Sequence, residues 1–260
     1  MKRYALIGNG FIGKKHIEAI SAVGGKLIAV CDIDETKRVD GIPFFTDYKK
    51  AIEMADIISI ATPNDTHTTI ALEASRAGKT IICEKPITFS FTELELMKRV
   101  PKLYGMFQLR KLKEIPEMRK LAQEAKFAEL VVEMKRSSSY HSSWKGDINR
   151  TGGLLINIGT HYFDIIGHLF GYDNFISESE KTEIKSEGTL IYPNISVKWR
   201  IELTDEKPQY ERSLSIQGKK FDLVQKENLH IDVYEDVMWG HGTTVSEEEK
   251  ILNMISIIKK

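Results

Sequence analysis

The stretch GGLLINIGTHYFD, residues 152–164, carries three side chains whose types are suited to chemistry: the Asn157 amide, the His161 imidazole and the Asp164 carboxylate. They are spaced i, i+4 and i+7, so a helix would place them on one stripe. An imidazole can move a proton near neutral pH, whereas an amide can only orient a bound group. The spacing alone fits a solvent-facing stripe and a catalytic face in a pocket equally well.

A second candidate for proton transfer is Lys85, in the segment CEKP that ends an apolar run. A lysine beside an alcohol can hydrogen-bond the hydroxyl and help to move its proton. Taken alone, a lysine at the end of such a run is more often a surface residue. Whether Lys85 is a site residue or a surface residue therefore depends on the motifs in the rest of the chain.

The glycine-rich stretch GNGFIG, residues 8–13, fits the pattern G-x-G-x-x-G between a predicted strand and a predicted helix, where it indicates a dinucleotide site. Gly8 allows a tight turn, Gly10 the close approach of a pyrophosphate, and Gly13 the packing of the helix on the sheet. Asp32 ends the next strand, where a carboxylate binds a ribose and repels a 2′-phosphate. The pattern favours NAD over NADP; a structural glycine turn with a solvated Asp is the alternative.

Two more polar segments, ATPNDTH (61–67) and CEKP (83–86), follow later strands at the edge where ligands bind in such folds. His67 could cap the helix that it opens and do nothing else. We predict no metal ligands. The predicted cofactor contacts are Gly8, Asn9, Gly10, Phe11, Ile12, Gly13, Asp32, Ile33, Thr62, Pro63, Asn64, His67, Glu84, Lys85 and Gln108.

The elements that must position these residues follow two patterns. In the first, apolar strand-like runs alternate with helical periodicity, which predicts a parallel sheet covered by helices on both faces. The strands are predicted at 4–8, 26–32, 56–62, 79–85 and 103–108, and the helices at 11–23, 47–54, 65–77 and 91–100.

After residue 110 the pattern changes. Strand-like runs follow one another without long helices between them, which predicts an α+β domain with a mainly antiparallel sheet. We therefore predict one domain over 1–110 and another over 111–260, whose C-terminal helices can pack back on the first. The predicted helices are 114–125, 229–240 and 246–259, and the strands 128–138, 189–193, 195–203, 211–218 and 219–224.

Composition excludes several classes of protein. Lys+Arg and Asp+Glu both number 37, so no net charge points to nucleic acid or a membrane surface. The two cysteines, Cys31 and Cys83, lie in apolar runs, which excludes a disulfide framework and fits a reducing compartment. No run of about 18 apolar residues and no signal-peptide core occurs, so we expect a cytoplasmic protein.

The set GNGFIG, TPNDTH, CEKP and GGLLINIGTHYFD, in this order, resembles the Gfo/Idh/MocA family of oxidoreductases over nearly the whole chain. The resemblance implies an α/β protein: an N-terminal Rossmann domain with a doubly wound parallel sheet, and a C-terminal α+β domain whose open sheet mediates oligomerisation. It also implies that Lys85 and His161 lie beside the nicotinamide and act on a substrate hydroxyl. This favours the pocket as the surroundings of His161.

The chain departs from the family at Asn157, where the helix motif commonly has Asp. An amide cannot act as a base, so proton transfer falls to His161 or Lys85. With SSWKGD (142–147), FQLR (107–110), VKWRIEL and ENLHIDVYEDVM, the segment resembles the subgroup that oxidises UDP-N-acetylglucosaminuronic acid at C3 for bacterial surface polysaccharides such as O-antigen.

A nucleotide sugar acid carries a diphosphate and a carboxylate, so its pocket needs cationic donors. Each candidate could instead be a surface charge or a core aromatic. Two alternatives stay open: a dehydrogenase of another sugar or inositol, and a regulator that binds NAD without turnover. We expect a homo-oligomer, dimer or tetramer, without nucleic-acid or membrane partners. The predicted substrate contacts are Asn157, Lys145, Trp144, Arg110 and Arg150.

Overall fold

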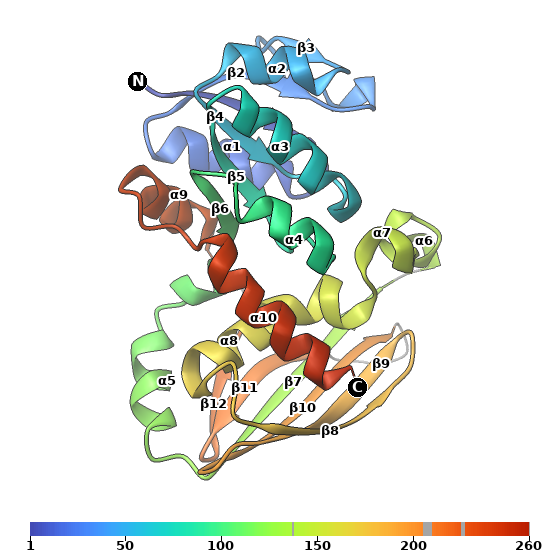
Figure 1. The fold of residues 1–260 in the computed structure, drawn as a ribbon, viewed down its shortest axis with the longest axis vertical. Helices are drawn as coiled ribbons and strands as arrows, with labels where there is room; N and C mark the ends of the chain where they lie inside the picture. The colour runs from blue at the N-terminus through green and yellow to red at the C-terminus, as the bar shows by residue number, and fades with distance from the viewer. Residues whose placement is uncertain (137, 205–209, 225–226, 260) are drawn as a thin grey trace. The chain divides into compact units, whose positions relative to one another are not determined.

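The computed structural model describes residues 1–136, 138–204, 210–224 and 227–259, and the chain divides into two compact units (Figure 1). Unit 1 consists of Met1–Gln108 and Glu227–Glu248; unit 2 consists of Leu109–Lys226 and Glu249–Lys260. The chain thus leaves unit 1 near residue 108. It returns to unit 1 over residues 227–248, which contain helix α9 (His230–Met238) and the start of helix α10 (Val245–Ile258). We call Glu227–Glu248 the returning segment.

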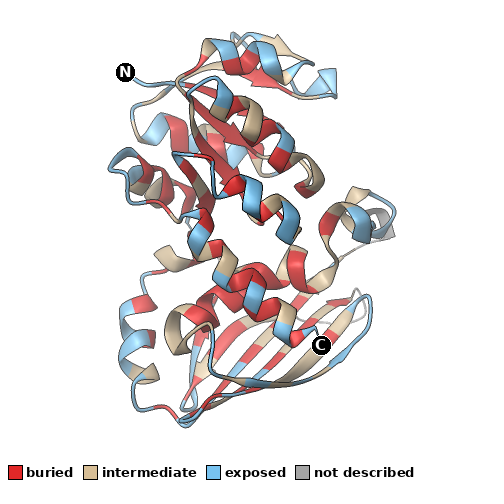
Figure 2. Cartoon of the chain, viewed as in Figure 1, coloured by how far each residue is buried: buried red, intermediate tan, exposed pale blue. Residues whose placement is uncertain are grey.

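Unit 1 contains a six-stranded sheet in the order β3-β2-β1-β4-β5-β6, in which every pairing is parallel. The order reverses between β1 and β4, which creates the crevice where nucleotides bind in doubly wound folds. The central strands are buried along their length, as their unbroken apolar runs predict (Figure 2). The strands are β1 Arg3–Ile7, β2 Lys26–Cys31, β3 Phe44–Phe45, β4 Ile57–Ile60, β5 Thr80–Glu84 and β6 Leu103–Met106.

The predicted Rossmann architecture is confirmed, and the short strand β3 is the element of this sheet that we did not predict. A two-residue strand is too short to leave a periodic pattern in the sequence. Helices α2 and α4 begin where the side chains of Asp47 and Ser90 accept hydrogen bonds from first-turn N–H groups. Helix α9 packs against α1. The helices are α1 Gly13–Ala22, α2 Tyr48–Met54, α3 His67–Arg76, α4 Phe91–Met97 and α9 His230–Met238.

Unit 2 contains a six-stranded sheet in the order β12-β11-β7-β10-β9-β8. β7 and β10 pair in parallel and the other pairings are antiparallel, so the mainly antiparallel sheet that we predicted is confirmed, with one parallel pair in its middle. We did not predict β8, because its sequence ISESEK has no continuous apolar face. The strands are β7 Phe127–Lys135, β8 Ile176–Lys181, β9 Lys185–Ile191, β10 Ser196–Thr204, β11 Arg212–Ile216 and β12 Lys219–Asp222.

Our predicted strand 128–138 ends early, at Lys135, and its residue 137 lies outside the described part of the chain.

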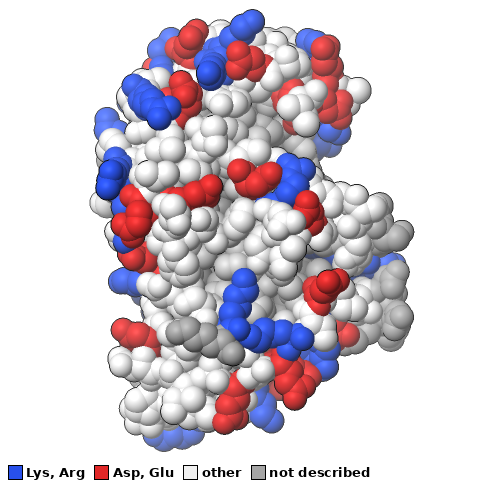
Figure 3. Space-filling view, turned by 45° about the vertical axis from the view of Figure 1, so that its right-hand side comes forward, with Lys and Arg blue, Asp and Glu red and all other residues white. Residues whose placement is uncertain are grey.

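Within what is described, every helix is too short or too polar to cross a membrane. Basic and acidic side chains are interspersed over the face shown in Figure 3, in keeping with their equal numbers. Helices α5 Ile115–Ala122 and α10 Val245–Ile258 complete the longer elements.

The segment that carries Asn157 and His161 is helical, as its spacing suggested, but its first part is not an α-helix. Residues Leu155–Gly159 form a π-helical turn, η5, which continues directly into α8 at Thr160. A π turn holds more residues than an α turn, so the predicted single stripe is broken. Asp164 is 1% exposed, whereas His161 is partly exposed. The pieces before it are α6 Ser138–His141, η4 Trp144–Gly146 and α7 Ile148–Thr151; α8 spans Thr160–Phe170.

Candidate active site

The geometry of the loop after β1 requires glycine at two positions, and a third glycine leaves room for a ligand. Gly8 has φ +91°, and a Cβ there would lie 2.5 Å from the carbonyl oxygen of Ala61. A Cβ on Gly13 would lie 2.6 Å from Asn9 Oδ1, whereas one on Gly10 would meet no atom within 4 Å. Gly8 and Gly13 therefore allow the tight turn, and Gly10 leaves open space over the backbone. A pyrophosphate needs such an approach.

The N-terminus of α1 is available to an anion. The helix begins after Ile12 with no side-chain cap and no acidic residue in its first turn. Its first N–H groups have no partners within the helix, and the helix dipole favours negative charge there. The loop and helix therefore fit the diphosphate of a dinucleotide without contribution from a metal.

Asp32 is fixed at the end of β2. Its carboxylate accepts the backbone N–H groups of Asn9, at 2.7 Å, and Asp34, at 2.9 Å. The predicted cofactor residues on either side are exposed apolar side chains: Phe11 is 90% exposed and Ile33 is 93% exposed. Apolar surface of this extent beside a fixed carboxylate fits an adenosine, whose ribose needs an acceptor and whose base needs an apolar contact.

The first arginine after Asp32 is engaged elsewhere. Arg38 donates a hydrogen bond to Glu35 at 2.7 Å, and its guanidinium lies 4.5 Å from the centre of the Phe44 ring. A 2′-phosphate would have to compete with this carboxylate for the guanidinium and would face the Asp32 charge. The local charges therefore fit NAD better than NADP.

The loop after β4 is joined to the loop after β5 by His67. One ring nitrogen lies 2.9 Å from the carbonyl oxygen of Thr62 and the other 2.8 Å from that of Pro86, and the side chain is fully buried. Burial lowers the pKa of His67. Both ring nitrogens face protein carbonyls, so His67 joins the two cofactor loops, and its predicted direct contact with the cofactor stays a prediction.

The remaining predicted residues of this loop lie beside that bridge. The Thr62 hydroxyl accepts a hydrogen bond from Thr66 at 2.7 Å, Pro63 precedes the 3₁₀ turn η2 (Asn64–Thr66), and Asn64 is 5% exposed. Gln108, the last residue of the first part of unit 1, is 4% exposed. Their contacts with the cofactor stay predictions.

Lys85 follows the last residue of β5 and precedes Pro86 through a cis peptide bond. It is partly exposed, whereas Glu84 before it is buried. The Glu84 carboxylate lies 3.1 Å from His16 Nε2 and 3.2 Å from His230 Nε2. Burial raises its pKa, but hydrogen bonds from the two histidines outweigh burial and hold the pKa well below its usual range. A charged, fixed carboxylate thus stands directly before Lys85.

In unit 2, the structure brings together three predicted substrate residues and two that we missed. Asn157 Nδ2 donates to the Tyr140 hydroxyl at 3.2 Å, and the Tyr140 ring lies 4.9 Å from the Arg136 guanidinium carbon and 5.9 Å from Lys145 Nζ. Lys145 Nζ also lies 5.8 Å from the Trp144 ring. We call these five residues the cationic–aromatic cluster. Arg136 was missed although it directly follows a strand, the usual place for a site residue.

The two cations of the cluster have no acidic partner among the described residues. Burial lowers the pKa of Lys145, and the positive charge of Arg136 lowers it further. Two cations that disfavour each other, over aromatic rings, form a place where an anion with a ring is stabilised. The cluster therefore fits a substrate that carries phosphate or carboxylate groups.

Arg110, a predicted substrate residue, is paired with a buried carboxylate. Its Nε and Nη2 donate to the Asp164 carboxylate at 2.9 and 2.7 Å, and the Tyr172 hydroxyl donates to the same carboxylate at 2.9 Å. The side chains of Arg110 and Asp164 are 12% and 1% exposed. A buried bidentate pair compensates both charges and anchors α8, and the predicted substrate contact of Arg110 stays a prediction.

Arg150 on α7 and His161 in the first turn of α8 are partly exposed. His161 lies in unit 2 and Lys85 in unit 1, so their joint action on one alcohol stays a prediction.

Comparisons with known proteins decide the family. The sequence model described as the oxidoreductase family, NAD-binding Rossmann fold, matches residues 2–106, and the one described as its C-terminal alpha/beta domain matches residues 126–249. The chain belongs to the Gfo/Idh/MocA family. Unit 1 thus carries an NAD-binding Rossmann domain, in agreement with the glycine loop and Asp32.

Curated relatives act on different sugars and polyols. The glucose-6-phosphate 3-dehydrogenase of Bacillus subtilis is 27% identical, over 72% of this chain and 58% of its own length. The inositol 2-dehydrogenase of Rhizobium meliloti is 28% identical, over 65% of this chain and 55% of its own. The chain therefore spans less than two thirds of the length of these relatives.

Solved structures give a more specific likeness. The WlbA (WbpB) dehydrogenase of Thermus thermophilus in complex with NAD and UDP-GlcNAcA is 27% identical, with a TM-score of 0.89 over 100% of this chain and 95% of that one. The same dehydrogenase is known in complex with NAD and alpha-ketoglutarate. The WlbA dehydrogenase of Bordetella pertussis is 20% identical with a TM-score of 0.84, a likeness in fold alone.

Proposed function

We propose that the protein is an NAD-dependent dehydrogenase that oxidises the 3-hydroxyl of UDP-N-acetylglucosaminuronic acid to the 3-keto sugar nucleotide, a step toward surface polysaccharide such as O-antigen. The observation that carries the proposal is the cationic–aromatic cluster. It offers two cations without described acidic partners, an amide donor and two aromatic rings, which suit a charged sugar nucleotide. The similar Thermus thermophilus dehydrogenase, crystallised with NAD and UDP-GlcNAcA, supports this choice.

The proposed mechanism divides the work among six side chains. Bound NAD supplies the hydride acceptor. His161 takes the proton of the 3-hydroxyl, and the Lys85 ammonium stabilises the alkoxide that develops; the two roles could be exchanged. Asn157 cannot take a proton and orients the sugar instead, with Tyr140 fixing its amide at 3.2 Å. Arg136 and Lys145 bind the anionic groups.

The test compares substrates on one enzyme preparation. With NAD present, UDP-N-acetylglucosaminuronic acid is expected to raise the melting temperature and to produce NADH absorbance, whereas myo-inositol and free sugars do neither. A parallel reaction with alpha-ketoglutarate, a compound bound by the similar dehydrogenase, measures whether reduced cofactor is reoxidised in place. Turnover of a free polyol without response to the UDP-sugar acid contradicts the proposal.

The second candidate is dehydrogenation of another sugar, supported by the curated relatives. Glucose 6-phosphate is the informative competitor because it is also an anion, so it tests whether the cluster needs the nucleotide. A regulator that binds NAD without turnover would show cofactor binding and no NADH with any of these compounds. We further propose a cytoplasmic homo-oligomer, dimer or tetramer, without nucleic-acid or membrane partners.

A further inference from the structure

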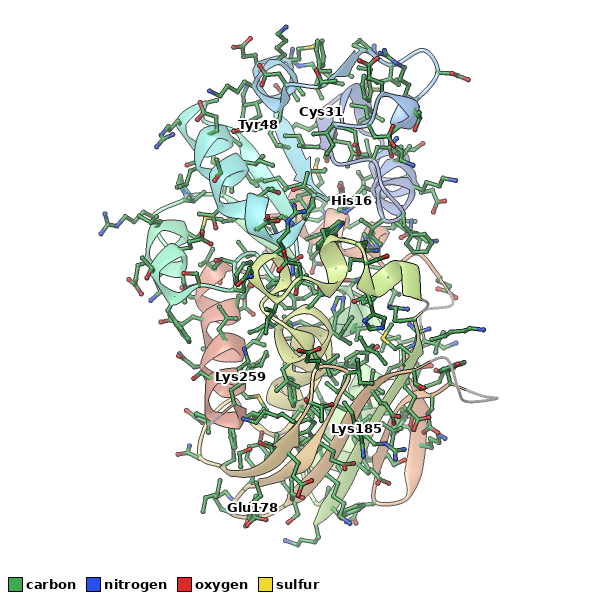
Figure 4. The ribbon with its side chains drawn as sticks, turned by 90° about the vertical axis from the view of Figure 1, so that its right-hand side faces the viewer. His16, Cys31, Tyr48, Glu178, Lys185 and Lys259 are labelled. Carbon is green, nitrogen blue, oxygen red and sulfur yellow. The ribbon has the colours of Figure 1, made fainter. Side chains whose placement is uncertain are left out.

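Unit 1 contains a buried polar network outside the glycine loop, and Glu84 is its one member among the predicted cofactor contacts. It joins side chains from α1, β4, β5 and α9, each at most 9% exposed. A group of this size in an apolar core is costly unless every member has a partner. We call it the Glu84 network; its members are Ser59, Tyr234, His16 (labelled in Figure 4), Glu84 and His230.

The hydrogen bonds of the Glu84 network have one consistent direction. His16 Nε2 and His230 Nε2 both face Glu84 Oε1, at 3.1 and 3.2 Å, and an ionised carboxylate only accepts, so both nitrogens carry hydrogen. The other nitrogen of a neutral His16 is then an acceptor, and the Tyr234 hydroxyl donates to it at 2.8 Å. The Ser59 hydroxyl donates to Tyr234 at 2.5 Å.

The charge of the network rests on Glu84. Burial lowers the pKa of His16, which favours the neutral imidazole that this direction requires. The Glu84 carboxylate keeps its charge because two N–H donors face it. The last residue of β5 is thereby tied to α1 and α9 at once.

The backbone after Lys85 is held as firmly as the residue before it. The Ile87 N–H donates to Glu248 Oε1 at 2.6 Å, and His67 faces the Pro86 carbonyl oxygen at 2.8 Å. Glu248 and His67 are both fully buried. The peptide that carries Lys85 is therefore fixed on both sides.

Three of these holding groups, His230, Tyr234 and Glu248, come from the returning segment, which lies more than a hundred residues after Lys85 in the sequence. We propose that the returning segment is a positioning element for Lys85: through Glu84 and Ile87 it fixes the backbone from which the ammonium reaches the substrate. This inference rests on the proposed function, because it assigns Lys85 a place in the reaction. None of the three residues needs to touch substrate or cofactor.

The positions of His16, Glu84 and His230 also admit another occupant. Their three nearest ligand atoms lie within 4.8 Å of one another, a spacing that can hold a metal ion. We favour hydrogen bonds because both nitrogen–oxygen distances are normal for them and because Tyr234 and Ser59 continue the same directional chain. Metal analysis of the purified protein is therefore part of the test.

The first experiment uses two pairs of variants in the full chain with NAD bound. His230→Leu removes the donor to Glu84, whereas His230→Gln keeps an N–H at a similar reach. Tyr234→Phe removes the donor to His16, whereas Tyr4→Phe removes the hydroxyl of an equally buried tyrosine of the same core, whose partner is Met238 Sδ. Tyr4 is the matched control for loss of a buried hydroxyl.

His230→Leu and Tyr234→Phe are expected to lower kcat roughly 10- to 100-fold with the KM for NAD changed little, because displacement of a catalytic group acts on the transition state. His230→Gln restores most of the loss and Tyr4→Phe stays near wild type. A wild-type kcat in both removing variants, no rescue by His230→Gln, an equal loss in Tyr4→Phe, or a stoichiometric metal ion in the wild-type protein overturns the inference.

A second measurement needs no substrate and separates this inference from the proposed function. Hydrogen exchange of the peptide around Ile87 is expected to quicken roughly tenfold in Glu248→Leu, which removes the acceptor, and in His230→Leu, and to stay unchanged in Tyr4→Phe. If the wild-type enzyme fails to oxidise the UDP-sugar acid but this peptide loosens as expected, the substrate assignment fails and the positioning element stands. Unchanged exchange in both the Glu248 and the His230 variant contradicts the positioning role of the returning segment, whatever the substrate is.

Discussion

The Lys85 loop and the cationic–aromatic cluster differ in how completely their polar groups are paired within the protein. In unit 1, Glu84, Pro86 and Ile87 all have buried hydrogen-bond partners, so the group proposed for chemistry sits on a fixed backbone. In unit 2, Arg136 and Lys145 have no described acidic partner and lie at a strand end and on a short 3₁₀ turn. A reacting group benefits from a geometry set before binding, whereas a site for an anion can remain incomplete until the anion arrives.

The largest effect is expected from removing the proposed proton-transfer pair. Lys85→Ala and His161→Ala each lower kcat by roughly 10²–10⁴, because each removes proton transfer or alkoxide stabilisation in the transition state. Steady-state NADH production measures this, with the melting temperature of each variant as the control for folding. Near-normal rates in both variants would show that neither side chain takes part in the reaction, and the fixed Lys85 loop would then have no role in catalysis.

A paired and an unpaired cation should differ sharply in their effect on stability. Arg110→Ala leaves the 1%-exposed Asp164 carboxylate without its guanidinium and is expected to lower the free energy of unfolding by about 3–5 kcal/mol. Arg136→Ala removes a cation that has no described acidic partner, so its effect is expected to stay below about 1 kcal/mol. Denaturant titration compares the two, and equal losses would show that Arg136 is as structural as Arg110.

The same cluster variants should act on the substrate. Arg136→Ala and Lys145→Ala are expected to raise the KM for the sugar nucleotide roughly 10- to 100-fold, since a hydrogen bond to a charged group contributes about 1.5–3 kcal/mol. The KM for NAD is the internal control and stays unchanged. Measuring the KM for the sugar nucleotide at two salt concentrations completes the test. A raised KM for NAD, with an unchanged KM for the sugar nucleotide, would show that the two cations bind the cofactor and not the substrate.

The smallest effect is a loss of stability in acid from the buried histidines of unit 1. Burial lowers the pKa of His16 and of His67, so the unfolded chain binds protons more readily than the folded one below the unfolded value of 6.5. Stability is complete above pH 6.5 and falls below it, by up to about 1.4 kcal/mol per pH unit for each imidazole that stays neutral. Denaturation at pH 7.5, 6.5 and 5.5 measures this slope, which His16→Gln should reduce; a flat profile contradicts it.

Much of the fold could be predicted from the sequence because periodicity records local burial. The unbroken apolar runs of unit 1 predicted a parallel sheet, and the glycines of GNGFIG predicted a turn whose geometry requires them at Gly8 and Gly13. Asp32 could likewise be assigned, since its place at a strand end follows from the same alternation. Strands β3 and β8 escaped prediction because one is very short and the other lacks an apolar face.

Only the tertiary structure decided which polar groups are partners. The pairing of Arg110 with Asp164 could not be predicted from the sequence. Nothing near His16 in the sequence indicates that His230, 214 residues later, faces the same carboxylate. The sequence by itself determined the alternation of elements and the turn chemistry, because these depend on near neighbours. The meeting of buried charges depends on how the chain closes on itself, which leaves no periodic trace along it.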